Sequence, residues 1–303
     1  MSKSKTRSYL KLLQQEFPHL KFKTDEYFRN HTTFGIGGKI AVYVEVEKPS
    51  DIIRLVKILN REGIRYFILG LGSNLLVSDQ FHDLVVIKNN IKGIRIRGEK
   101  VVCGAGESLV RLNNIAMENC LSGLEWSYGI PGSVGGAIKM NSGSFGGEMR
   151  DVVDCVYYFD GIKICKKSVA SLDFSYRHSY FSDKNFVILK VVLKLQKAKR
   201  EDVEKKSFEV LKVRRKVQPH NYKSAGSVFK KPKDNFAPVL IESCGLKGLC
   251  RGGAEISTKH CGFIINKTGN AKFSNVFWII CKIKETVCKK YGIMLVEEIE
   301  IIR

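Results

Sequence analysis

The chain has 303 residues, of which 44% are hydrophobic and 27% are charged, a composition typical of globular proteins with two or three domains. The net charge of +21 comes from 51 basic and 30 acidic residues and invites comparison with nucleic-acid-binding proteins. However, basic and acidic residues are mixed along most of the chain, and no aromatic RNA-binding signature accompanies them. Composition and charge therefore favour a solvated basic surface, and we expect no nucleic-acid partner.

The cysteines and the first residues indicate the compartment. None of the nine cysteines stands in a C-x-x-C pair and the six histidines are scattered, so we predict no metal site. The first residues, MSKSKTRSYLKLLQQ, contain no continuous apolar segment of the kind that a secretory leader needs. No stretch approaches the ~20 apolar residues of a membrane span. We expect reduced cysteines, a cytoplasmic location and no membrane span.

A helix and a strand are predicted between residues 50 and 69. Ser50 is a suitable N-cap, and Gly63 ends the helical pattern. The apolar residues recur at helical spacing: Ile52, Leu55, Val56 and Leu59. The strand at 65–69 leads into GLGSN at 70–74, but a dinucleotide-binding fingerprint would need a third glycine at Leu75 and a helix after it. The residues that follow are strand-like, so this segment is not a Rossmann domain.

The rest of the chain alternates between helices and strands. Helices are predicted at 109–123, 200–219 and 274–292, and strands at 151–159, 186–195, 260–266 and 293–302. The charged helix at 200–219 is typical of a hinge into a last domain, and Gly292 caps the last helix. This alternation favours an α/β or α+β class.

Seven glycines fall between Tyr128 and Met149, in YGIPGSVGGAIKMNSGSFGGEM. Glycine inside regular structure costs roughly 0.5–1 kcal/mol relative to alanine. So dense a run is typical either of tight surface turns or of a cradle whose N–H groups bind a phosphate. The stretch alone leaves both interpretations open.

Three glycine-containing loops occur in this one chain: NHTTFGIGG at 30–38, GLGSN at 70–74 and GIPGSVGGA at 129–137. Together they resemble the FAD-binding half of the p-cresol methylhydroxylase-type flavoproteins, in which several loops hold the flavin pyrophosphate. The resemblance implies an α+β fold, two FAD-binding subdomains and bound FAD. It implies cofactor contacts from Thr33, Gly37, Gly70, Gly72, Ser73, Asn74, Gly129, Gly132, Ser133, Gly135, Gly136 and Asn141.

Five further motifs follow in order: FSYRHSYF at 174–181, RRKVQP at 214–219, SAGSVFKKP at 224–232, GGAEISTKHCGFIIN at 252–266 and GIMLVEEIEII at 292–302. From about residue 30 onward the chain resembles the UDP-N-acetylenolpyruvoylglucosamine reductase family. The resemblance implies that NADPH reduces FAD, and that FAD reduces UDP-N-acetylglucosamine enolpyruvate to UDP-N-acetylmuramate in peptidoglycan precursor synthesis. It also implies a monomer with FAD-binding subdomains at 1–95 and 96–200 and a C-terminal α/β substrate-binding domain at 201–303.

The functional residues of that family transfer to matching positions. Ser227 in AGSVF corresponds to the proton donor, and Arg177 in YRHS to the arginine that stabilises the substrate carboxylate. Glu298 in LVEEI corresponds to an assisting acid, which needs a raised pKa in a partly dehydrated site. Glu297 is the alternative if the register shifts by one. Substrate contacts are implied for Tyr176, Arg214, Arg215 and Lys230, although both arginines lie on a helix whose charges can equally face water.

The chain departs from the family pattern at two positions near these motifs. Lys231 replaces the usual asparagine, and Glu300 replaces an arginine that often follows the acid by two positions. The stretch LQKAKREDVEKK lacks the tyrosine of a loop that covers the substrate in one branch of the family, so the chain resembles the other branch.

Three other hypotheses remain compatible with the sequence. A flavin oxidase of the same fold would carry a covalent flavin link, for which His31 and Cys103 are the conceivable attachment points. A nucleic-acid-binding protein would hold no flavin and would bind with steep salt dependence. A degenerate homologue that binds FAD without turnover would account for Lys231 and Glu300.

Overall fold

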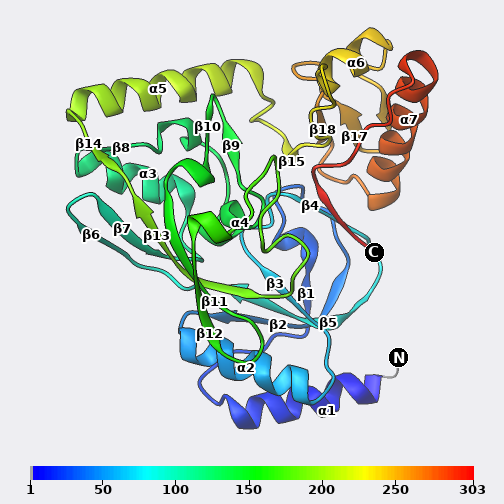
Figure 1. Ribbon diagram of the computed structural model, residues 1–303. Helices are drawn as coiled ribbons and strands as arrows, with labels where there is room; N and C mark the ends of the chain where they lie inside the picture. The colour runs from blue at the N-terminus through cyan, green and yellow to red at the C-terminus, as the bar shows by residue number, and fades with distance from the viewer. Residues whose placement is uncertain (1–2) are drawn as a thin grey trace. The chain divides into compact units, whose positions relative to one another are not determined.

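The structure is a computed structural model that describes residues 3–303 (Figure 1). Met1 and Ser2, with which the predicted first subdomain and the N-terminal segment begin, lie outside the described residues. Between Lys3 and Arg303, no helix is long and apolar enough to cross a membrane. The nine cysteines are free thiols, as expected of reduced cysteines.

The chain folds into two compact units, each assembled from segments that are far apart in the sequence. The larger unit contains the residues up to Asp25, Ala41–Leu71 and Asp83–Val213, and the smaller contains Glu26–Ile40, Gly72–His82 and Arg214–Arg303. Buried apolar residues form three clusters, two in the larger unit and one in the smaller. The domain boundaries near residues 95 and 200 stay a prediction.

Helices and sheets are mixed throughout, as the α+β class requires. The helices are α1 (Lys3–Glu16), α2 (Pro49–Arg61), α3 (Leu109–Glu118), α4 (Val134–Lys139), α5 (Arg200–Val217), α6 (Ala237–Ser243) and α7 (Phe273–Tyr291). The strands are β1 (Glu26–Tyr27), β2 (Lys39–Val46), β3 (Tyr66–Leu69), β4 (Leu75–Val77), β5 (His82–Asn89), β6 (Ile94–Arg97), β7 (Lys100–Gly104), β8 (Leu121–Ser122), β9 (Gly143–Ser144), β10 (Gly147–Glu148), β11 (Val153–Phe159), β12 (Ile164–Ser168), β13 (Val187–Lys194), β14 (Gln196–Lys197), β15 (Lys223–Ser227), β16 (Cys250–Arg251), β17 (Ala254–Ile256), β18 (Phe263–Asn266) and β19 (Glu300–Ile302).

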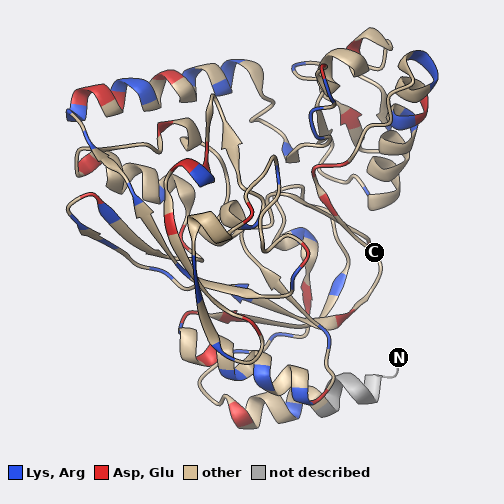
Figure 2. Cartoon of the chain, viewed as in Figure 1, with Lys and Arg blue, Asp and Glu red and all other residues tan. Residues whose placement is uncertain are grey.

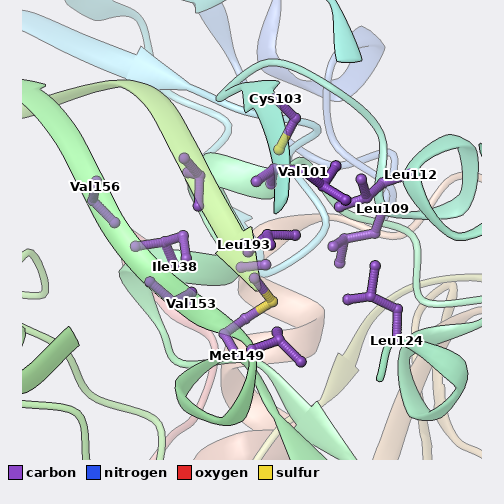
Figure 3. Packing of buried hydrophobic residues seen from close by; sticks show 14 of the residues in the cluster. Val101, Cys103, Leu109, Leu112, Leu124, Ile138, Met149, Val153, Val156 and Leu193 are labelled. Atoms are coloured by element: carbon purple, nitrogen blue, oxygen red, sulfur yellow. The ribbon is translucent and has the colours of Figure 1, made fainter. Parts of the chain in front are cut away.

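A five-stranded antiparallel sheet lies at the centre of the larger unit, in the order β12-β11-β13-β7-β6. Its middle strand, β13, reads VILKVVLK, and both of its lysines are exposed while the six apolar side chains are buried. A nearly continuous apolar run is what a strand covered on both faces needs. Residues of α3 and α4 complete this core, which includes Val101, Leu112, Ile138 and Leu193 (Figure 3).

Helices α1 and α2 lie side by side (Figure 1) and pack on strands β2 and β5. The predicted apolar stripe of α2 is buried there: Ile52, Leu55, Val56 and Leu59. The start of α2 differs from the prediction, because Lys48 is the N-cap and Ser50 lies inside the helix. Pro49 occupies the first turn, where its missing N–H costs no hydrogen bond and its fixed φ suits the helix.

The smaller unit is built on the antiparallel sheet β15-β18-β17-β16, against which α6 and α7 pack. Helix α7 buries its predicted stripe: Val276, Ile279, Ile280, Ile283 and Val287. Gly292 ends α7 with φ of +68°, a left-handed conformation that glycine adopts without a Cβ penalty.

The last strand is shorter than predicted. Only β19 forms, parallel to β4, whereas residues 293–299 contain one isolated bridge, between Phe229 and Glu297. Alternating apolar and polar residues predict a strand of ten residues, but β4 offers a partner of only three. Glu298 therefore lies just before the strand that was expected to contain it.

Candidate active site

The predicted cofactor loops at 30–38 and 72–74 meet within the smaller unit. Thr33 donates its N–H to the Gly72 carbonyl oxygen at 3.1 Å and its hydroxyl to the Ser224 carbonyl oxygen at 2.7 Å. Gly72 has φ of +64°, and a Cβ there would overlap the carbonyl oxygen of His31. Position 72 therefore requires glycine both for its backbone conformation and for the close approach of the other loop.

The turn at 72–74 presents backbone donors that the protein itself does not use. Among the described residues, no protein acceptor is found for the N–H groups of Gly72 and Ser73. Asn74 is engaged differently, because its side chain donates to the Glu298 carbonyl oxygen at 3.0 Å. Unpaired N–H groups in a glycine turn suit phosphate oxygens, so Gly72 and Ser73 fit the pyrophosphate of FAD.

The glycine-rich stretch begins α4 in the larger unit. Ser133 caps this helix by accepting the N–H of Gly136 at 3.3 Å. For the N–H groups of Gly132 and Ser133, too, no protein acceptor is found within residues 3–303. Gly70 lies against the same serine, since a Cβ at position 70 would overlap the Ser133 hydroxyl, and Gly129 has φ of +84°. Two predicted cofactor loops thus meet at Ser133.

The glycines of the predicted cofactor loops differ in how much space a side chain would have at each position. A Cβ at Gly135 would lie 3.0 Å from the Cβ of Ala105, and the Gly135 N–H donates to the Ala105 carbonyl oxygen at 2.7 Å. Packing also explains Gly37, whose Cβ would lie 2.5 Å from that of Phe28. Gly136 is exposed, and a Cβ there would meet only a hydroxyl oxygen at 3.2 Å. Close packing therefore accounts for Gly37 and Gly135, while Gly136 is left facing solvent at the cradle.

Glu107 supports the start of α4, although no sequence motif singled it out. Its carbonyl oxygen accepts the Val134 N–H at 2.8 Å. Its carboxylate accepts the N–H groups of Gly93 and Ser108 and pairs with Arg111 at 2.8 Å. Burial works against the charge, but the hydrogen bonds and Arg111 outweigh it and lower the pKa of Glu107. This stabilisation is present above the ordinary carboxyl pKa of ~4.3 and is lost as pH falls through the lowered value.

Arg177 lies at the tip of a two-residue turn in the larger unit. Ser175 and His178 exchange two backbone hydrogen bonds of 3.1 Å, which leaves Tyr176 and Arg177 between them. Arg177 has φ of +54°, and its Nη2 donates to the Gly143 carbonyl oxygen at 2.8 Å. Tyr176 is 48% exposed, and its ring centre lies 5.1 Å from the guanidinium. The turn thus presents an exposed aromatic ring beside an oriented cation.

Ser227 and Glu298 are brought together in the smaller unit. Ser227 ends β15 opposite Phe263, and the next residue, Val228, accepts the Glu298 N–H at 2.8 Å. Both Ser227 and Glu298 are partly exposed. In the part of the chain that the structure describes, no hydrogen bond of the Ser227 hydroxyl to another residue is found. The segments that carry Ser227 and Glu298, which are predicted to share a site, are therefore hydrogen-bonded neighbours.

The neighbouring Glu297 is engaged with α7. Its carboxylate pairs with the ammonium of Lys284 at 2.8 Å, and its backbone forms the bridge to Phe229. An oxygen that binds a lysine of its own chain is unsuited to donating a proton to a ligand. This ion pair makes Glu297 poorly suited to the role of the assisting acid.

Arg214 and Arg215, which the sequence could not distinguish as substrate contacts, differ in burial. Arg214 is 5% exposed, whereas Arg215 is exposed. Burial lowers the pKa of Arg214 to about 10, which is far enough above neutral to keep the guanidinium charged. Lys230 is partly exposed and is fixed by its N–H, which donates to the Val296 carbonyl oxygen at 2.8 Å. A charged group held out of bulk water suits an anionic ligand better than a solvated one.

Cys103 and His31 are poorly suited to a covalent flavin link. Cys103 is 1% exposed, and burial raises the pKa of its thiol to about 12, which suppresses the nucleophilic thiolate. His31 pairs with Glu26 at 3.0 Å. Of the two departures from the family pattern, the ammonium of Lys231 lies 4.5 Å from the ring centre of the exposed Phe236, and Glu300 is exposed.

A cavity of about 510 Å³ in the larger unit is bounded by α5, the β9–β10 hairpin and Trp126. The residues that line it include none of the predicted site residues. Its charged side chains carry both signs: Glu125, Asp151, Glu209, Lys194 and Lys206. Mixed charges favour no class of ligand, so the cavity is not assigned to the site.

Known proteins share both the fold and the motifs. Residues 218–302 match the family described as the C-terminal domain of UDP-N-acetylenolpyruvoylglucosamine reductase, and residues 40–162 match an FAD binding domain. The chain is 41% identical over 284 residues to the UDP-N-acetylenolpyruvoylglucosamine reductase of Caldanaerobacter subterraneus subsp. tengcongensis, which covers 93% of this chain and 94% of that protein. It is 42% identical over 274 residues to the reductase of Thermotoga petrophila, and the match covers 89% of this chain and 95% of that protein. The crystal structure of the enzyme from Thermus caldophilus superposes with a TM-score of 0.80 at 33% sequence identity. The match covers 94% of this chain and 99% of that chain.

These likenesses confirm the predicted α+β flavoprotein fold and its C-terminal domain. The FAD-binding match spans both the turn at 72–74 and the glycine-rich stretch. Both contain backbone N–H groups for which no protein acceptor is found within residues 3–303. Each of these loops therefore offers backbone donors that suit the phosphate groups of FAD.

Proposed function

Because the chain belongs to the UDP-N-acetylenolpyruvoylglucosamine reductase family, it is an FAD-binding oxidoreductase of peptidoglycan precursor synthesis, and we propose that Arg177, Glu298 and Ser227 carry out its reaction. The reaction reduces the enolpyruvyl group of UDP-N-acetylglucosamine enolpyruvate to UDP-N-acetylmuramate. Bound FAD supplies the hydride to the vinyl carbon of the substrate after receiving it from NADPH.

Each of the three side chains has a separate task in this proposal. Arg177 binds the substrate carboxylate and stabilises the negative charge that develops beside it, as a guanidinium can do with two parallel hydrogen bonds. Glu298, in its protonated form, donates a hydrogen bond to the same developing charge. Ser227 then gives its proton to the carbon next to the carboxylate. A hydroxyl is a weak acid, but proton transfer to so basic a carbon runs downhill.

One contact supports this assignment most directly. The Glu298 N–H donates to the carbonyl oxygen of Val228, the residue after Ser227, at 2.8 Å. Two motifs that are far apart in the sequence therefore share one backbone hydrogen bond. The Asn74 side chain donates to the Glu298 carbonyl oxygen at 3.0 Å, which adds a member of a cofactor loop to the same neighbourhood.

The cradle and the substrate contacts follow from the same geometry. We assign phosphate oxygens of FAD to the unpaired N–H groups of Gly132 and Ser133 in the larger unit. In the smaller unit, the N–H groups of Gly72 and Ser73 are further candidates for FAD phosphate oxygens. Of the two arginines on α5, the buried Arg214 suits the anionic part of the sugar nucleotide. We also propose that the chain acts in the cytoplasm, as a monomer and without a nucleic-acid partner.

The proton donor is tested by Ser227→Ala in a single turnover. The FAD-loaded variant is reduced with NADPH without oxygen, and the return of oxidised flavin is followed after UDP-N-acetylglucosamine enolpyruvate is added. We expect this step to slow by roughly 10²–10⁴-fold, the usual contribution of general acid catalysis, while reduction by NADPH keeps its rate. Ser227→Cys, which retains a proton donor, should recover part of the loss. A Ser227→Ala rate within threefold of the unmodified enzyme would remove Ser227 from its role.

A further inference from the structure

The turn that carries Arg177 is anchored on both sides to the segment that follows α4. On one side, the Asn141 side chain donates to the Ser175 carbonyl oxygen at 3.0 Å. On the other, the Ser179 hydroxyl donates to the carbonyl oxygen of Lys139, the last residue of α4, at 2.7 Å. Both anchoring residues are buried, Asn141 completely and Ser179 to 1% exposure.

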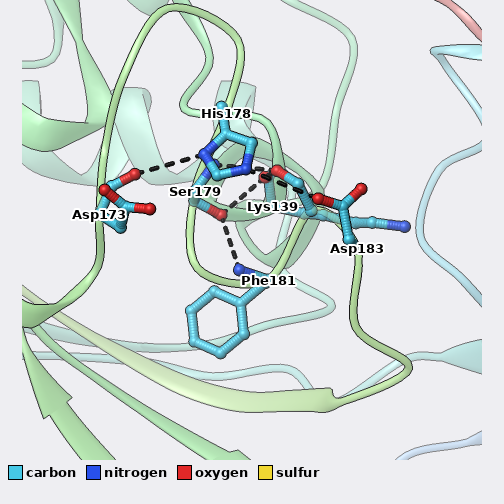
Figure 4. Close-up of polar contacts among 7 residues, drawn as sticks. Lys139, Asp173, His178, Ser179, Phe181 and Asp183 are labelled. Carbon is cyan, nitrogen blue, oxygen red and sulfur yellow. Dashed lines mark hydrogen bonds and ion pairs between the residues drawn. The ribbon is translucent and has the colours of Figure 1, made fainter.

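Each anchoring side chain makes a second hydrogen bond in addition to the one that holds the turn. The Asn141 oxygen accepts the Arg150 N–H at 3.0 Å, so the amide is used at both ends. The Ser179 hydroxyl also accepts the Phe181 N–H at 3.2 Å, and Figure 4 shows it between that N–H and the Lys139 carbonyl oxygen. These bonds fix the rotamer of each side chain, and with it the path of the chain on either side of the turn.

The guanidinium is held by the same segment as its backbone. Arg177 donates through Nη2 to the Gly143 carbonyl oxygen at 2.8 Å, and Gly143 follows Asn141 by two residues. Three hydrogen bonds therefore join this segment to the turn. They link residue 139 to 179, residue 141 to 175, and residue 143 to 177.

We propose that Ser179 and Asn141 are positioning residues that hold Arg177 in the orientation its proposed role requires. Arg177 has φ of +54°, a left-handed conformation that costs a non-glycine residue roughly 1–2 kcal/mol. Such a conformation persists only where the surroundings over-determine it, and the two anchors supply that constraint. The amide of Asn141, which the family resemblance implies as an FAD contact, also ties the turn to the segment that follows α4.

The inference rests on the proposed role of Arg177 in binding the substrate carboxylate, and it predicts which half of the reaction suffers. A displacement of about 1 Å in a positioned group costs on the order of 10²-fold in rate. Loss of one of two anchors should cost less, about tenfold, and only in the step that involves the substrate. Reduction of the flavin by NADPH does not use the carboxylate and should keep its rate.

The experiment is a double-mutant cycle on the FAD-loaded enzyme. Ser179→Ala, Arg177→Lys and the double variant are compared with the unmodified enzyme in two anaerobic measurements: flavin reduction by NADPH and flavin reoxidation by UDP-N-acetylglucosamine enolpyruvate. We expect Ser179→Ala to slow reoxidation about tenfold in the unmodified background but less than about threefold when position 177 is lysine. The coupling arises because lysine lacks the planar group that the anchors orient.

Matched variants separate positioning from simple loss of stability. Ser171→Ala makes the same substitution at an exposed serine of the same unit and should leave both rates unchanged. Ser179→Thr retains the hydroxyl and should recover most of the reoxidation rate. If Ser179→Ala fails to fold, Asn141→Asp tests the second anchor, because it keeps the oxygen and replaces the donor to Ser175 by an acceptor.

The outcomes distinguish this inference from the role on which it rests. If Arg177→Lys does not slow reoxidation, the proposed role of Arg177 fails first. If Arg177→Lys slows it but Ser179→Ala does not, only the positioning inference is wrong. Equal losses in both half-reactions, or the same loss in both backgrounds, would mean that Ser179 serves the fold alone and would overturn the inference.

Discussion

Two neighbouring glutamates near the C-terminus show how much the surroundings of a residue matter. Glu297 and Glu298 are chemically identical and adjacent, yet their contacts differ. The Glu297 carboxylate pairs with Lys284 at 2.8 Å, whereas the Glu298 N–H donates to the carbonyl oxygen of Val228, the residue after Ser227. The Glu297 carboxylate anchors the final segment to α7, and we propose that the Glu298 carboxyl group acts on the substrate. Sequence motifs allowed either residue to be the acid, because a motif does not show which way a side chain points.

This division of roles predicts opposite effects of the same substitution. Glu298→Gln should lower kcat by roughly 10²-fold, because an amide N–H donates a weaker hydrogen bond to the developing charge than a carboxylic O–H. Glu297→Gln should instead leave kcat within about threefold and destabilise the protein by about 0.5 kcal/mol, the scale of a partly exposed ion pair.

Steady-state rates and thermal unfolding of both FAD-loaded variants check this prediction. Lys284→Met provides the matched control, since it removes the ion pair from the other side and should resemble Glu297→Gln. A large loss of kcat in Glu297→Gln together with an active Glu298→Gln would reverse the assignment.

At the scale of elements, α4 combines a structural and a functional use of adjacent glycines. Gly135 lies against Ala105 at a distance that leaves no room for a side chain, whereas Gly136 is exposed. An exposed glycine in a helix is not explained by packing, because alanine would be favoured there by roughly 0.5–1 kcal/mol. We propose that close approach of the cofactor to the backbone is the reason for glycine at this position.

Alanine at the two positions should therefore act on different properties. Gly135→Ala should destabilise the FAD-free protein by about 1–3 kcal/mol, the usual cost of overpacking. Gly136→Ala should leave the FAD-free protein within about 1 kcal/mol of the unmodified chain. It should nevertheless weaken FAD binding about tenfold or more, because a methyl group would occupy space at the cradle.

Chemical unfolding without FAD and flavin titration of the FAD-free protein measure the two effects separately. Unchanged FAD affinity in Gly136→Ala would show that the cradle does not extend to this glycine. The assignment to Gly132 and Ser133 would then have to stand without it.

Elements with a strong period were predictable from sequence, and those that depend on a partner were not. The stripes of α2 and α7 follow from apolar residues at helical spacing, and Gly292 marked the end of α7. The last strand was predicted too long, since its extent depends on the length of β4 rather than on its own pattern. The cap of α2 shifted from Ser50 to Lys48 because Pro49 sets the first turn.

Family motifs single out Ser227, Glu298 and Arg177 as candidates, and their roles stay predictions. The arrangement of these residues was not predictable, because the hydrogen bond between Glu298 and Val228 depends on how two segments of the smaller unit pack. Ser179 lies in the motif FSYRHSYF and Asn141 in the glycine-rich stretch, but neither motif indicates that these residues anchor the Arg177 turn. Only the observation that a left-handed arginine needs support leads to them.

At the scale of the whole molecule, the charge of +21 is distributed rather than gathered. Figure 2 shows basic and acidic residues interspersed along α5, and the clusters at 212–216 and 230–233 belong to segments near the proposed substrate contacts. A field of this sign raises the local concentration of anionic sugar nucleotides around the protein without any specific contact. The excess of basic residues is thus compatible with a small anionic substrate.

The two compact units divide the proposed machinery between them. The larger unit holds Arg177 and the cradle at α4, and the smaller holds Ser227, Glu298 and the turn at 72–74. The central claim is that this chain reduces the enolpyruvyl substrate with its flavin. A test of that claim must therefore follow the flavin while the substrate is consumed.

The most direct measurement is an anaerobic cycle of the purified protein. FAD-loaded enzyme is bleached with one equivalent of NADPH, UDP-N-acetylglucosamine enolpyruvate is added, and the flavin absorbance is followed. We predict that the yellow colour returns at once and that the product carries two additional hydrogen atoms. A flavin that stays reduced until oxygen is admitted would contradict the substrate assignment, and a protein that binds no FAD would contradict the account as a whole.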